Sequence, residues 1–291
     1  MAAYIGFFGY LILAPVLGCL IAGVDRRITA RMQGRVGPPI LQPYYDVRKL
    51  LDKDSAAVNR VQIVYVAMYL VFAAVAGAIF FAGGNFLVAI FVLTLASLFF
   101  VVAGYSTRSP YAEAGAEREM MQVMSYEPMV LLVAIALYMV TGSFDVGGIA
   151  GAAATAGTPL IASLPLVFLG LIYVLTIKLR KSPFDLSTSH HAHQEIVKGI
   201  TTEMSGRTLA MVEITHWYES VLFLGWVGLF IVWGGWVSAI VAVVVCLAVY
   251  LLEIVIDNNF ARVKWQVMFR SAWALALVLG LLNIIGLYVF A

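Results

Sequence analysis

The sequence predicts an all-α integral membrane protein with eight transmembrane helices, and three observations support that fold class. Hydrophobic residues make up 63% of the 291 residues, 12% are charged, and the mean hydropathy is +0.96. Soluble domains, by contrast, carry about 25% charged residues. The chain also contains eight apolar runs near the length of about 20 residues that a spanning helix needs. A membrane β-barrel would instead require short segments in which apolar and polar residues alternate.

The eight runs define the expected spans, joined into a single transmembrane domain over residues 1–291. The spans are expected at about 4–24, 61–82, 85–104, 127–142, 160–178, 216–234, 236–256 and 271–290. Four long loops join them on one side, at 25–60, 105–126, 179–215 and 257–270. These loops are expected to carry short amphipathic helices, the first of them over 44–51.

Charge placement predicts the orientation of the bundle. All eighteen Lys and Arg residues lie in the four long loops or at their edges. Because basic loops stay on the cytoplasmic side, we expect the long loops inside, both termini outside, and the protein in the cell (cytoplasmic) membrane. The first run has no basic residue before it and Asp25, Arg26 and Arg27 directly after it, which favours a retained anchor over a cleaved signal.

The two cysteines do not indicate a redox centre in this chain. Cys19 and Cys246 both fall inside apolar runs. Two buried cysteines are too few for a disulfide framework or an iron–sulfur site. We therefore expect this chain to carry no redox centre of its own. The sequence motifs assign it no metal ligand and no catalytic residue.

The first long loop begins with an arginine cluster and a Gly-Pro-Pro break. One interpretation is a topological anchor whose arginines meet lipid phosphates. The other is a fixed docking surface, because an anchor has no need of a rigid break. The candidate docking residues are Arg26, Arg27, Arg31, Arg35, Gly37, Pro38, Pro39 and Gln42, with Arg118 from the second loop.

Acids and histidines gather in the later loops and at the starts of the following spans. An ionisable group at membrane depth costs on the order of 3 kcal/mol and is a functional candidate by default. The alternative for Glu127 is a helix-entry residue held by Arg118 or by a neighbouring hydroxyl. The candidate proton- or ion-coupling residues are Glu113, Glu117, Glu119, Glu127, Asp185, His193, Glu195, Glu203, Glu213, His216 and Glu219.

The third loop is unusual for its histidines at positions 190, 191 and 193. Histidine changes charge near neutral pH, which suits a proton relay. Imidazole is also a common zinc ligand, and a structural or interfacial role is a third interpretation. No His-Glu-x-x-His pattern and no cysteine lies nearby, which weighs against the metal.

Four loop motifs resemble those of a known family. The stretches are DRRITARMQGRVGPP, AEREMMQVMSYEP, KSPFDLSTSHHAHQEIVKGITTEMSG and EITHWYE. They resemble the membrane subunit that walls the quinone chamber of respiratory complex I, the NADH dehydrogenase subunit 1 family. By this resemblance, Arg118, Gln122, Tyr126 and Glu127 match the family's second loop. Residues matching its third loop are Pro183, Phe184, Asp185, Glu195, Glu203 and Gly206.

Two departures point within this superfamily toward the energy-converting group 4 nickel–iron hydrogenases. Complex I members carry Asn after the Gly-Pro of the first loop, where this chain has Pro39. They also carry an acid-rich sequence after Pro-Phe-Asp, where this chain has the histidine-containing stretch 190–193. The stretches SPYAEAGAEREMMQVMSYEP and STSHHAHQE are similar to the corresponding stretches of these hydrogenases, including the ferredoxin-linked and CO-induced types. The resemblance implies a membrane subunit that is not itself the catalyst.

The resemblance also implies partners and a role. The expected partners are the hydrogenase large and small subunits, iron–sulfur subunits and an antiporter-like membrane subunit, with the nickel–iron centre and iron–sulfur clusters borne by those partners. The subunit would dock the hydrogen-evolving arm and couple it to proton or sodium-ion translocation. Two rivals remain, a quinone-chamber subunit of complex I and an independent transporter; no inverted repeat is evident, which weighs against the second.

Overall fold

The structure is a computed structural model that describes residues 2–54, 59–181, 183–184, 187 and 199–290. Across those residues it is helical, apart from two isolated β-bridges, so the predicted fold class is confirmed. The helices are α1 (Ala2–Met32), α2 (Gln42–Leu51), α3 (Arg60–Phe81), α4 (Phe86–Tyr105), α5 (Pro110–Thr141), α6 (Val146–Ala156), α7 (Pro165–Lys178), α8 (Gly206–Ile231), α9 (Gly235–Asn259), α10 (Trp265–Leu275) and α11 (Leu281–Phe290). Short turns η1 (Leu160–Ala162) and η2 (Gly199–Thr201) and a π-helical segment η3 (Ala276–Gly280) complete the described part.

Within the described ranges, seven helices are long and apolar enough to cross a membrane, so the chain is a multi-pass membrane protein. The seventh of them is the continuous segment from α10 through η3 to α11. The expected span 160–178 is instead the turn η1 followed by the 14-residue helix α7. At 1.5 Å per residue α7 is about 21 Å long, shorter than a hydrocarbon core of about 30 Å. The predicted count of eight full-length spans is therefore not confirmed.

Several helices extend beyond the apolar runs that predict them. Helix α1 continues to Met32, α5 begins at Pro110 and α8 begins at Gly206. The predicted second loop is thus the first part of α5, where Pro110 occupies the opening position of the helix. The predicted amphipathic helix of the first loop is confirmed as α2.

The sequence also predicts a short helix that holds Glu195 and Glu203. Glu195 lies outside the described residues, and Glu203 lies in a turn after η2.

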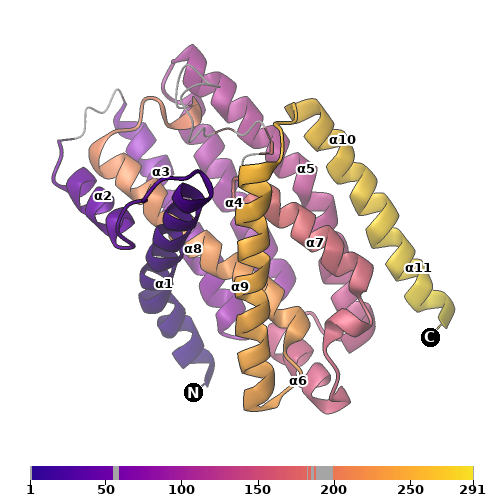
Figure 1. The fold of residues 1–291 in the computed structure, drawn as a ribbon. Coiled ribbons are helices and arrows are strands. Elements are labelled where there is room, and N and C mark those ends of the chain that lie inside the picture. Colours follow the sequence, from indigo (N-terminus) through magenta and orange to yellow (C-terminus); the bar gives the residue numbers. More distant parts are fainter. Residues whose placement is uncertain (1, 55–58, 182, 185–186, 188–198, 291) are drawn as a thin grey trace.

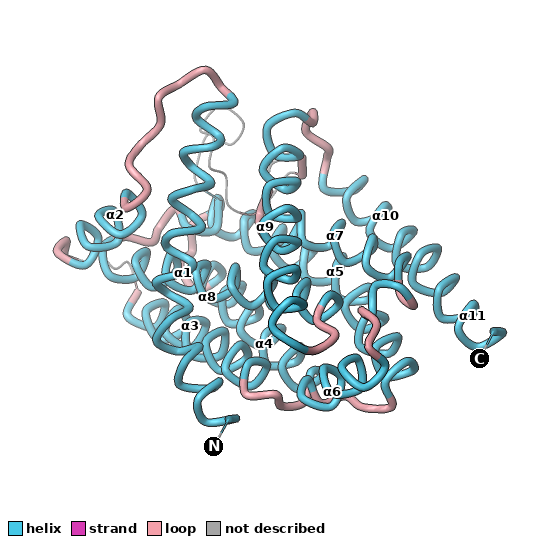
Figure 2. The backbone as a smooth tube through the Cα atoms, turned by 60° about the horizontal axis from the view of Figure 1, so that its bottom comes forward, coloured by secondary structure: helices cyan, strands magenta, loops and turns pink. Residues whose placement is uncertain are grey.

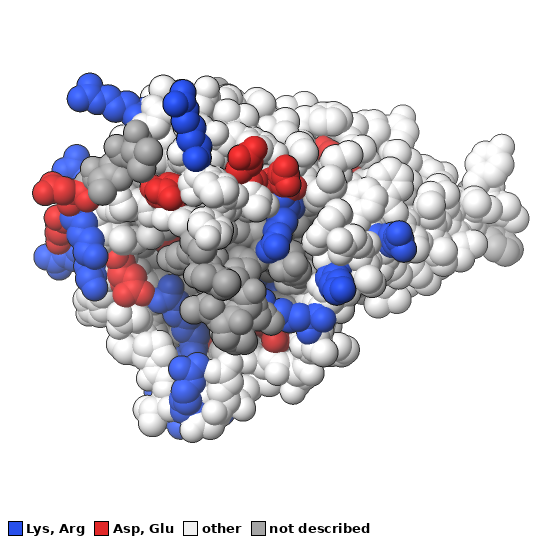
Figure 3. All heavy atoms as spheres, turned by 90° about the horizontal axis from the view of Figure 1, so that it is seen from above, with Lys and Arg blue, Asp and Glu red and all other residues white. Residues whose placement is uncertain are grey.

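The bundle has two chemically different ends. Figure 1 shows both chain termini near the end that carries α6, away from the loop between α1 and α2 and the junction of α9 with α10. Every described Lys and Arg residue lies toward the latter end, at or near the boundaries of helices there. We call it the basic end. Figure 3 views the molecule from this end. That the basic end faces the cytoplasm stays a prediction from the charge rule.

Two long helices contain an internal proline, and an aromatic side chain of a neighbouring helix replaces the missing hydrogen bond in each. Pro15 in α1 has no N–H to donate to the carbonyl of Leu11. The Tyr218 hydroxyl of α8 donates to that carbonyl, with 2.7 Å between the oxygens. Because a backbone group facing lipid finds no water partner, this contact both satisfies α1 and fixes it against α8.

In α5, too, a side-chain donor from a neighbouring helix replaces the backbone donor that a proline lacks. Pro128 leaves the carbonyl of Met124 without its helical donor. The indole N–H of Trp273 in α10 donates to that carbonyl at 3.1 Å. Helix α10 is thereby attached to the part of α5 that carries Glu127.

The short helix α7 is anchored at both ends. At its start, the Asn283 Oδ1 of α11 accepts hydrogen bonds from the main-chain N–H groups of Leu166 (3.0 Å) and Val167 (3.3 Å). These are first-turn donors that have no partner within the helix. Its other end forms the turn on which the candidate site is built. Figure 2 shows the backbone of the bundle, with α9 and the α10–α11 arm diverging.

Candidate functional site

A cavity of about 360 Å³ lies toward the basic end, walled by α1, α8, α9 and the end of α7. Its lining is rich in charged groups. The ionisable residues in its wall are Asp25, Arg26, Lys178, Arg180, Lys181, Glu213, His216, Glu219, Tyr250 and Asp257. The cavity is therefore a polar chamber that reaches into an otherwise apolar bundle.

The turn that ends α7 directs two cations into this region. Lys181 N–H donates to the carbonyl of Thr176 and Arg180 N–H to that of Ile177, both at 3.0 Å. Arg180 has a φ of +55°, the left-handed conformation that glycine usually supplies at such a helix end. A non-glycine residue there costs about 1–3 kcal/mol, and strain of this kind persists where the surroundings hold it.

Arg180 forms a buried ion pair with Glu119 of α5. Its two terminal nitrogens lie 3.2 Å and 3.0 Å from the two carboxylate oxygens of Glu119. The Ser187 hydroxyl also donates to this carboxylate. Burial alone would lower the pKa of Arg180, but the adjacent Glu119 carboxylate outweighs it and the pKa is raised. We call Glu119, Arg180 and Ser187 the Glu119 network.

Lys178 lies on the last turn of α7 beside this network and is held by aromatic rings. Its ammonium is 3.6 Å from the centre of the Tyr126 ring and 5.4 Å from that of Phe223. A cation over an aromatic face is stabilised by the ring quadrupole, by about 2 kcal/mol or more when desolvated. The carboxylates of Glu219, Glu119 and Glu127 all act on this ammonium. Lys178 is thus a cation shared among three acids that lie on two helices.

The other two of those acids have hydroxyl partners inside the bundle. Glu219 of α8 accepts a hydrogen bond from the Tyr69 hydroxyl of α3 at 3.0 Å, and both residues are buried. Glu127 of α5 accepts one from the Thr94 hydroxyl of α4, also at 3.0 Å. Glu127 comes eight residues after Glu119, so it is about 12 Å further along α5. The acids extend the polar region away from the cavity toward the middle of the bundle.

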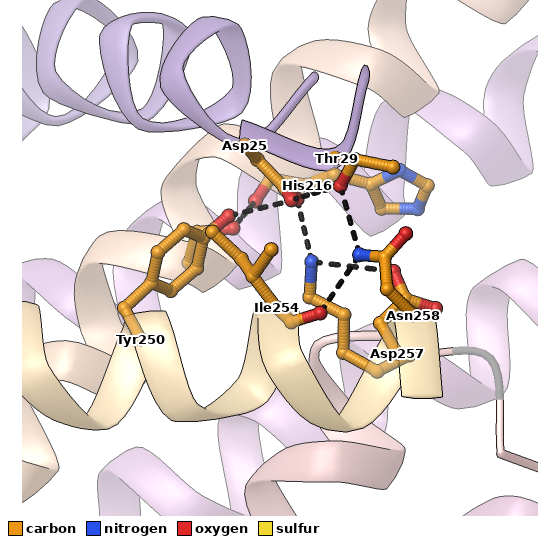
Figure 4. Close-up of polar contacts among 9 residues, drawn as sticks. Asp25, Thr29, His216, Tyr250, Ile254, Asp257 and Asn258 are labelled. Carbon is orange, nitrogen blue, oxygen red and sulfur yellow. Dashed lines mark hydrogen bonds and ion pairs between the residues drawn. The ribbon is translucent and has the colours of Figure 1, made fainter. Parts of the chain in front are cut away.

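A second network joins α1 to α9 across the cavity (Figure 4). The Lys181 ammonium lies 2.5 Å from Asp25 Oδ2 and 3.8 Å from Asp257 Oδ2. The Tyr250 hydroxyl donates to the same Asp25 oxygen at 3.2 Å. The Thr29 hydroxyl donates to the other Asp25 oxygen at 3.4 Å and accepts from Asn258 Nδ2 at 3.3 Å. The Asp25 network consists of Asp25, Thr29, Lys181, Tyr250, Asp257 and Asn258.

The structure brings together some of the predicted coupling residues and separates others. Glu119 and Glu219 are buried and Glu127 is half-buried in the region described above, and Glu213 and His216 line the cavity. Glu113 and Glu117 are exposed on the outer face of α5, and Glu203 is half-buried in its turn. Asp185, His193 and Glu195 lie outside the described residues.

The predicted docking residues lie on the surface of the basic end. The arginines at 26, 27, 31 and 35 are exposed, on the last turns of α1 and in the segment after it. Arg26 pairs with Asp46 of α2 at 2.5 Å, which connects α1 to α2. Gly37 has a φ of +78°, a backbone conformation that favours glycine. Pro38, Pro39 and Gln42 belong to the same surface connection, and Arg118 is half-buried on α5.

Sequence reasoning misses the cations that organise the site. In the sequence, Lys178, Arg180 and Lys181 look like no more than the basic flank of a span. Asp25 looks like the residue that follows an anchor, and Tyr69 like part of an apolar run. The one available signal is three basic residues in four positions shortly before a proline, which is more charge than a helix end needs.

Known proteins share the fold and the sequence pattern. A family model described as NADH dehydrogenase matches residues 5–288. Hydrogenase-4 component C of Escherichia coli (strain K12) is 29% identical, over 87% of this chain and 86% of the relative. A membrane subunit of the NADH-quinone oxidoreductase of Geobacillus kaustophilus (strain HTA426) is 30% identical, over 96% of this chain and 92% of the relative.

A solved structure has the same fold. It belongs to a chain of the membrane-bound sulfane sulfur reductase, an archaeal respiratory membrane complex, and matches with a TM-score of 0.87 over 99% of this chain and 100% of that one, at 23% identity. With the match over 5–288, these findings identify the chain as a member of the NADH dehydrogenase subunit 1 family, whose relatives include membrane subunits of hydrogenase complexes and of complex I.

Proposed function

We propose that this chain is the membrane-anchor and coupling subunit of an energy-converting nickel–iron hydrogenase complex. In this role it docks a ferredoxin-linked, hydrogen-evolving cytoplasmic arm and couples its reaction to translocation of protons or sodium ions. The observation that carries the proposal is the buried series of acids and cations that runs from the cavity at the basic end to Glu127 in α5. A subunit that served only as an anchor would have no need to bury so many charges.

The series provides a physical means of coupling. Glu119, Glu127 and Glu219 share the two cations Lys178 and Arg180. Because these acids share cations inside the bundle, a change in the surrounding charge changes how many of them stay ionised. An electron arriving on a partner's cluster above the basic end would favour proton uptake by these acids, and its departure would favour release. Glu203, in the turn before α8, lies on the entry side of the path, and Glu213 lines the cavity.

The partners follow from the same proposal. In this proposal the metal centres, a nickel–iron site and iron–sulfur clusters, belong to partner subunits. The exposed arginines on the last turns of α1 and in the segment after it offer the docking surface, and Figure 3 shows basic side chains spread over that face. An antiporter-like membrane subunit would receive the protonation change from Glu127.

The test replaces Glu127 with Gln in the assembled complex in liposomes, with reduced ferredoxin as donor. Hydrogen evolution and ion gradient formation are measured together. We expect hydrogen evolution to continue while the gradient per hydrogen molecule falls. Asp145→Asn is the matched control, because it makes the same change of a carboxylate to an amide at the opposite end of the bundle. A normal ratio in Glu127→Gln would refute the coupling role.

The second candidate is a quinone-chamber subunit of a respiratory complex I. It is favoured by the 30% identity, over 96% of this chain, with a membrane subunit of an NADH-quinone oxidoreductase. The purified complex distinguishes the two. Hydrogen evolution that is insensitive to quinone-site inhibitors supports the hydrogenase role, and inhibitor-sensitive quinone reduction without hydrogen supports the alternative.

A further inference from the structure

Glu253 of α9 is a fully buried acid that belongs to neither network. Its side chain is 0% exposed, and neither carboxylate oxygen has a hydrogen-bond partner in the described structure. An ionised carboxylate without donors is far too costly in an apolar interior to persist. Glu253 therefore requires either a bound proton or a cation moved next to it.

The groups around Glu253 come from each element that packs on this part of α9. From α7 comes Thr176, whose hydroxyl donates to the Ile172 carbonyl at 3.4 Å. From the turn after α7 comes the Lys181 ammonium, and from α9 itself Asp257; with Thr176 these are the groups that act on the Glu253 carboxyl. Helices α1 and α8 contribute Asp25 and His216 to the cavity wall beyond. The turn after α7 thus brings the Lys181 ammonium within electrostatic reach of this acid, although its ion pairs are with Asp25 and Asp257.

Helix geometry connects Glu253 to the cavity. Asp257 is one turn along α9, so both side chains project from the same face, with about 5–6 Å between their Cβ atoms. Asp257 lines the cavity and lies 3.8 Å from Lys181. Glu253 is therefore one turn deeper in the bundle than an acid that the cavity reaches. Figure 4 shows Tyr250, Ile254, Asp257 and Asn258 along this stretch of α9.

We propose that Glu253 is a proton-binding site that is loaded from the cavity through Asp257 and has Lys181 as its counter-ion when ionised. In the loaded state the carboxyl is neutral and the Lys181 ammonium pairs with Asp25, the arrangement the structure shows at 2.5 Å. On release, the proton passes to Asp257 and then to cavity water, and the Lys181 ammonium compensates the carboxylate left behind. One proton is bound and one released, and no electron is transferred by this chain. The site itself does not depend on the proposed function, although its use in coupling rests on it.

The experiment is infrared difference spectroscopy of the assembled complex in lipid, recorded across a pH jump. A protonated, buried carboxyl gives a C=O stretching band that shifts in deuterated water. We expect Glu253→Gln to remove one such band and Asp145→Asn to leave it. Should Glu253→Gln fail to assemble, Asp257→Asn serves instead, and we expect the band to appear more slowly after the jump.

The same complexes separate this inference from the proposed function. Ion translocation per hydrogen molecule is measured for the wild type and for Glu253→Gln. If the wild-type complex moves no ions, the proposed function is wrong whatever the spectra show. If Glu253→Gln retains every carboxyl band of the wild type, or if Asp257→Asn loads at the wild-type rate where only that variant assembles, the inference is overturned.

Discussion

Replacing Trp273 with Phe removes the indole N–H that serves the proline-freed carbonyl in α5. The perturbation is small in shape, because the ring stays aromatic and Trp273 is 40% exposed on the outer face of α10. What changes is the hydrogen bond of 3.1 Å to the carbonyl of Met124. That carbonyl has no helical donor, because residue 128 is proline.

The magnitude follows from two bounds. Leaving a buried acceptor without a partner costs about 1–3 kcal/mol. Side-chain hydrogen bonds within membranes measure lower, at about 0.6 kcal/mol on average and about 1.7 kcal/mol at most. Trp273 is partly exposed to the surroundings of the bundle, which favours the lower range. We therefore expect Trp273→Phe to lower the free energy of unfolding by about 1 kcal/mol.

A double-mutant cycle isolates this hydrogen bond from the change in packing. In Pro128→Ala the new N–H of residue 128 donates to the Met124 carbonyl, so the indole donor is no longer needed. Trp273→Phe should then cost clearly less than in the wild-type background. The free energy of unfolding is measured by titration with sodium dodecyl sulfate in mixed micelles. Trp236→Phe, an exposed position at the start of α9, is the control for the aromatic exchange.

Equal costs of Trp273→Phe in the two backgrounds would refute the reasoning. The indole would then contribute through packing alone, and the attachment of α10 to α5 would not depend on the proline. A cost in the wild type above about 3 kcal/mol would also contradict the estimate, because it exceeds what one orphaned acceptor accounts for.

Three further predictions concern α5 and α7. Arg180→Met leaves Glu119 buried without the guanidinium it pairs with. Because breaking a buried ion pair costs about 3–5 kcal/mol, we expect a lower free energy of unfolding and a loss of ion translocation. A free energy of unfolding equal to that of the wild type would show that the pair is dispensable. Gly115→Ala places a Cβ 2.2 Å from the backbone of η2, so we expect η2 to be displaced. The yield of assembled complex, measured by size-exclusion chromatography, should then fall, whereas the control Ala114→Ser on the exposed face should assemble normally. Asn283→Leu removes the acceptor that caps α7, and since a lost cap costs about 0.5–2 kcal/mol, the detergent midpoint of unfolding should fall; an unchanged midpoint would refute the capping role.

The fold class could be predicted from hydropathy, whereas the helix boundaries could not. A membrane-spanning helix produces a long apolar run, which is why the main spans are evident in the sequence. The run ends where polar residues begin, although α5 starts at Pro110 and α1 continues to Met32. Hydropathy also does not indicate the length of a helix whose end is capped by a side chain from another helix. The 14-residue α7 depends on Asn283 at its start, and that contact joins residues more than a hundred positions apart.

Glu127 and Glu219 could be predicted because a charge in an apolar run is conspicuous, and Glu119 because it lies eight residues before Glu127, on nearly the same helical face. Their partners could not, because Lys178 and Arg180 follow an apolar run, where basic residues are common. The decisive feature is the left-handed conformation of Arg180, which directs its side chain inward. Glycine and asparagine indicate such a conformation in a sequence, and arginine does not.

The place where α7 ends explains why one turn can serve both networks. Helix α7 ends at Lys178, where the apolar run also ends, and it is short because it begins only at Pro165. Its last turn borders the cavity between α1, α8 and α9, and its free carbonyls favour cations there. Arg180 then reaches Glu119 on α5, while the next residue, Lys181, reaches Asp25 on α1. Any displacement of this turn must change both ion pairs together, so an event at the basic end acts on α5 and α9 through a single element.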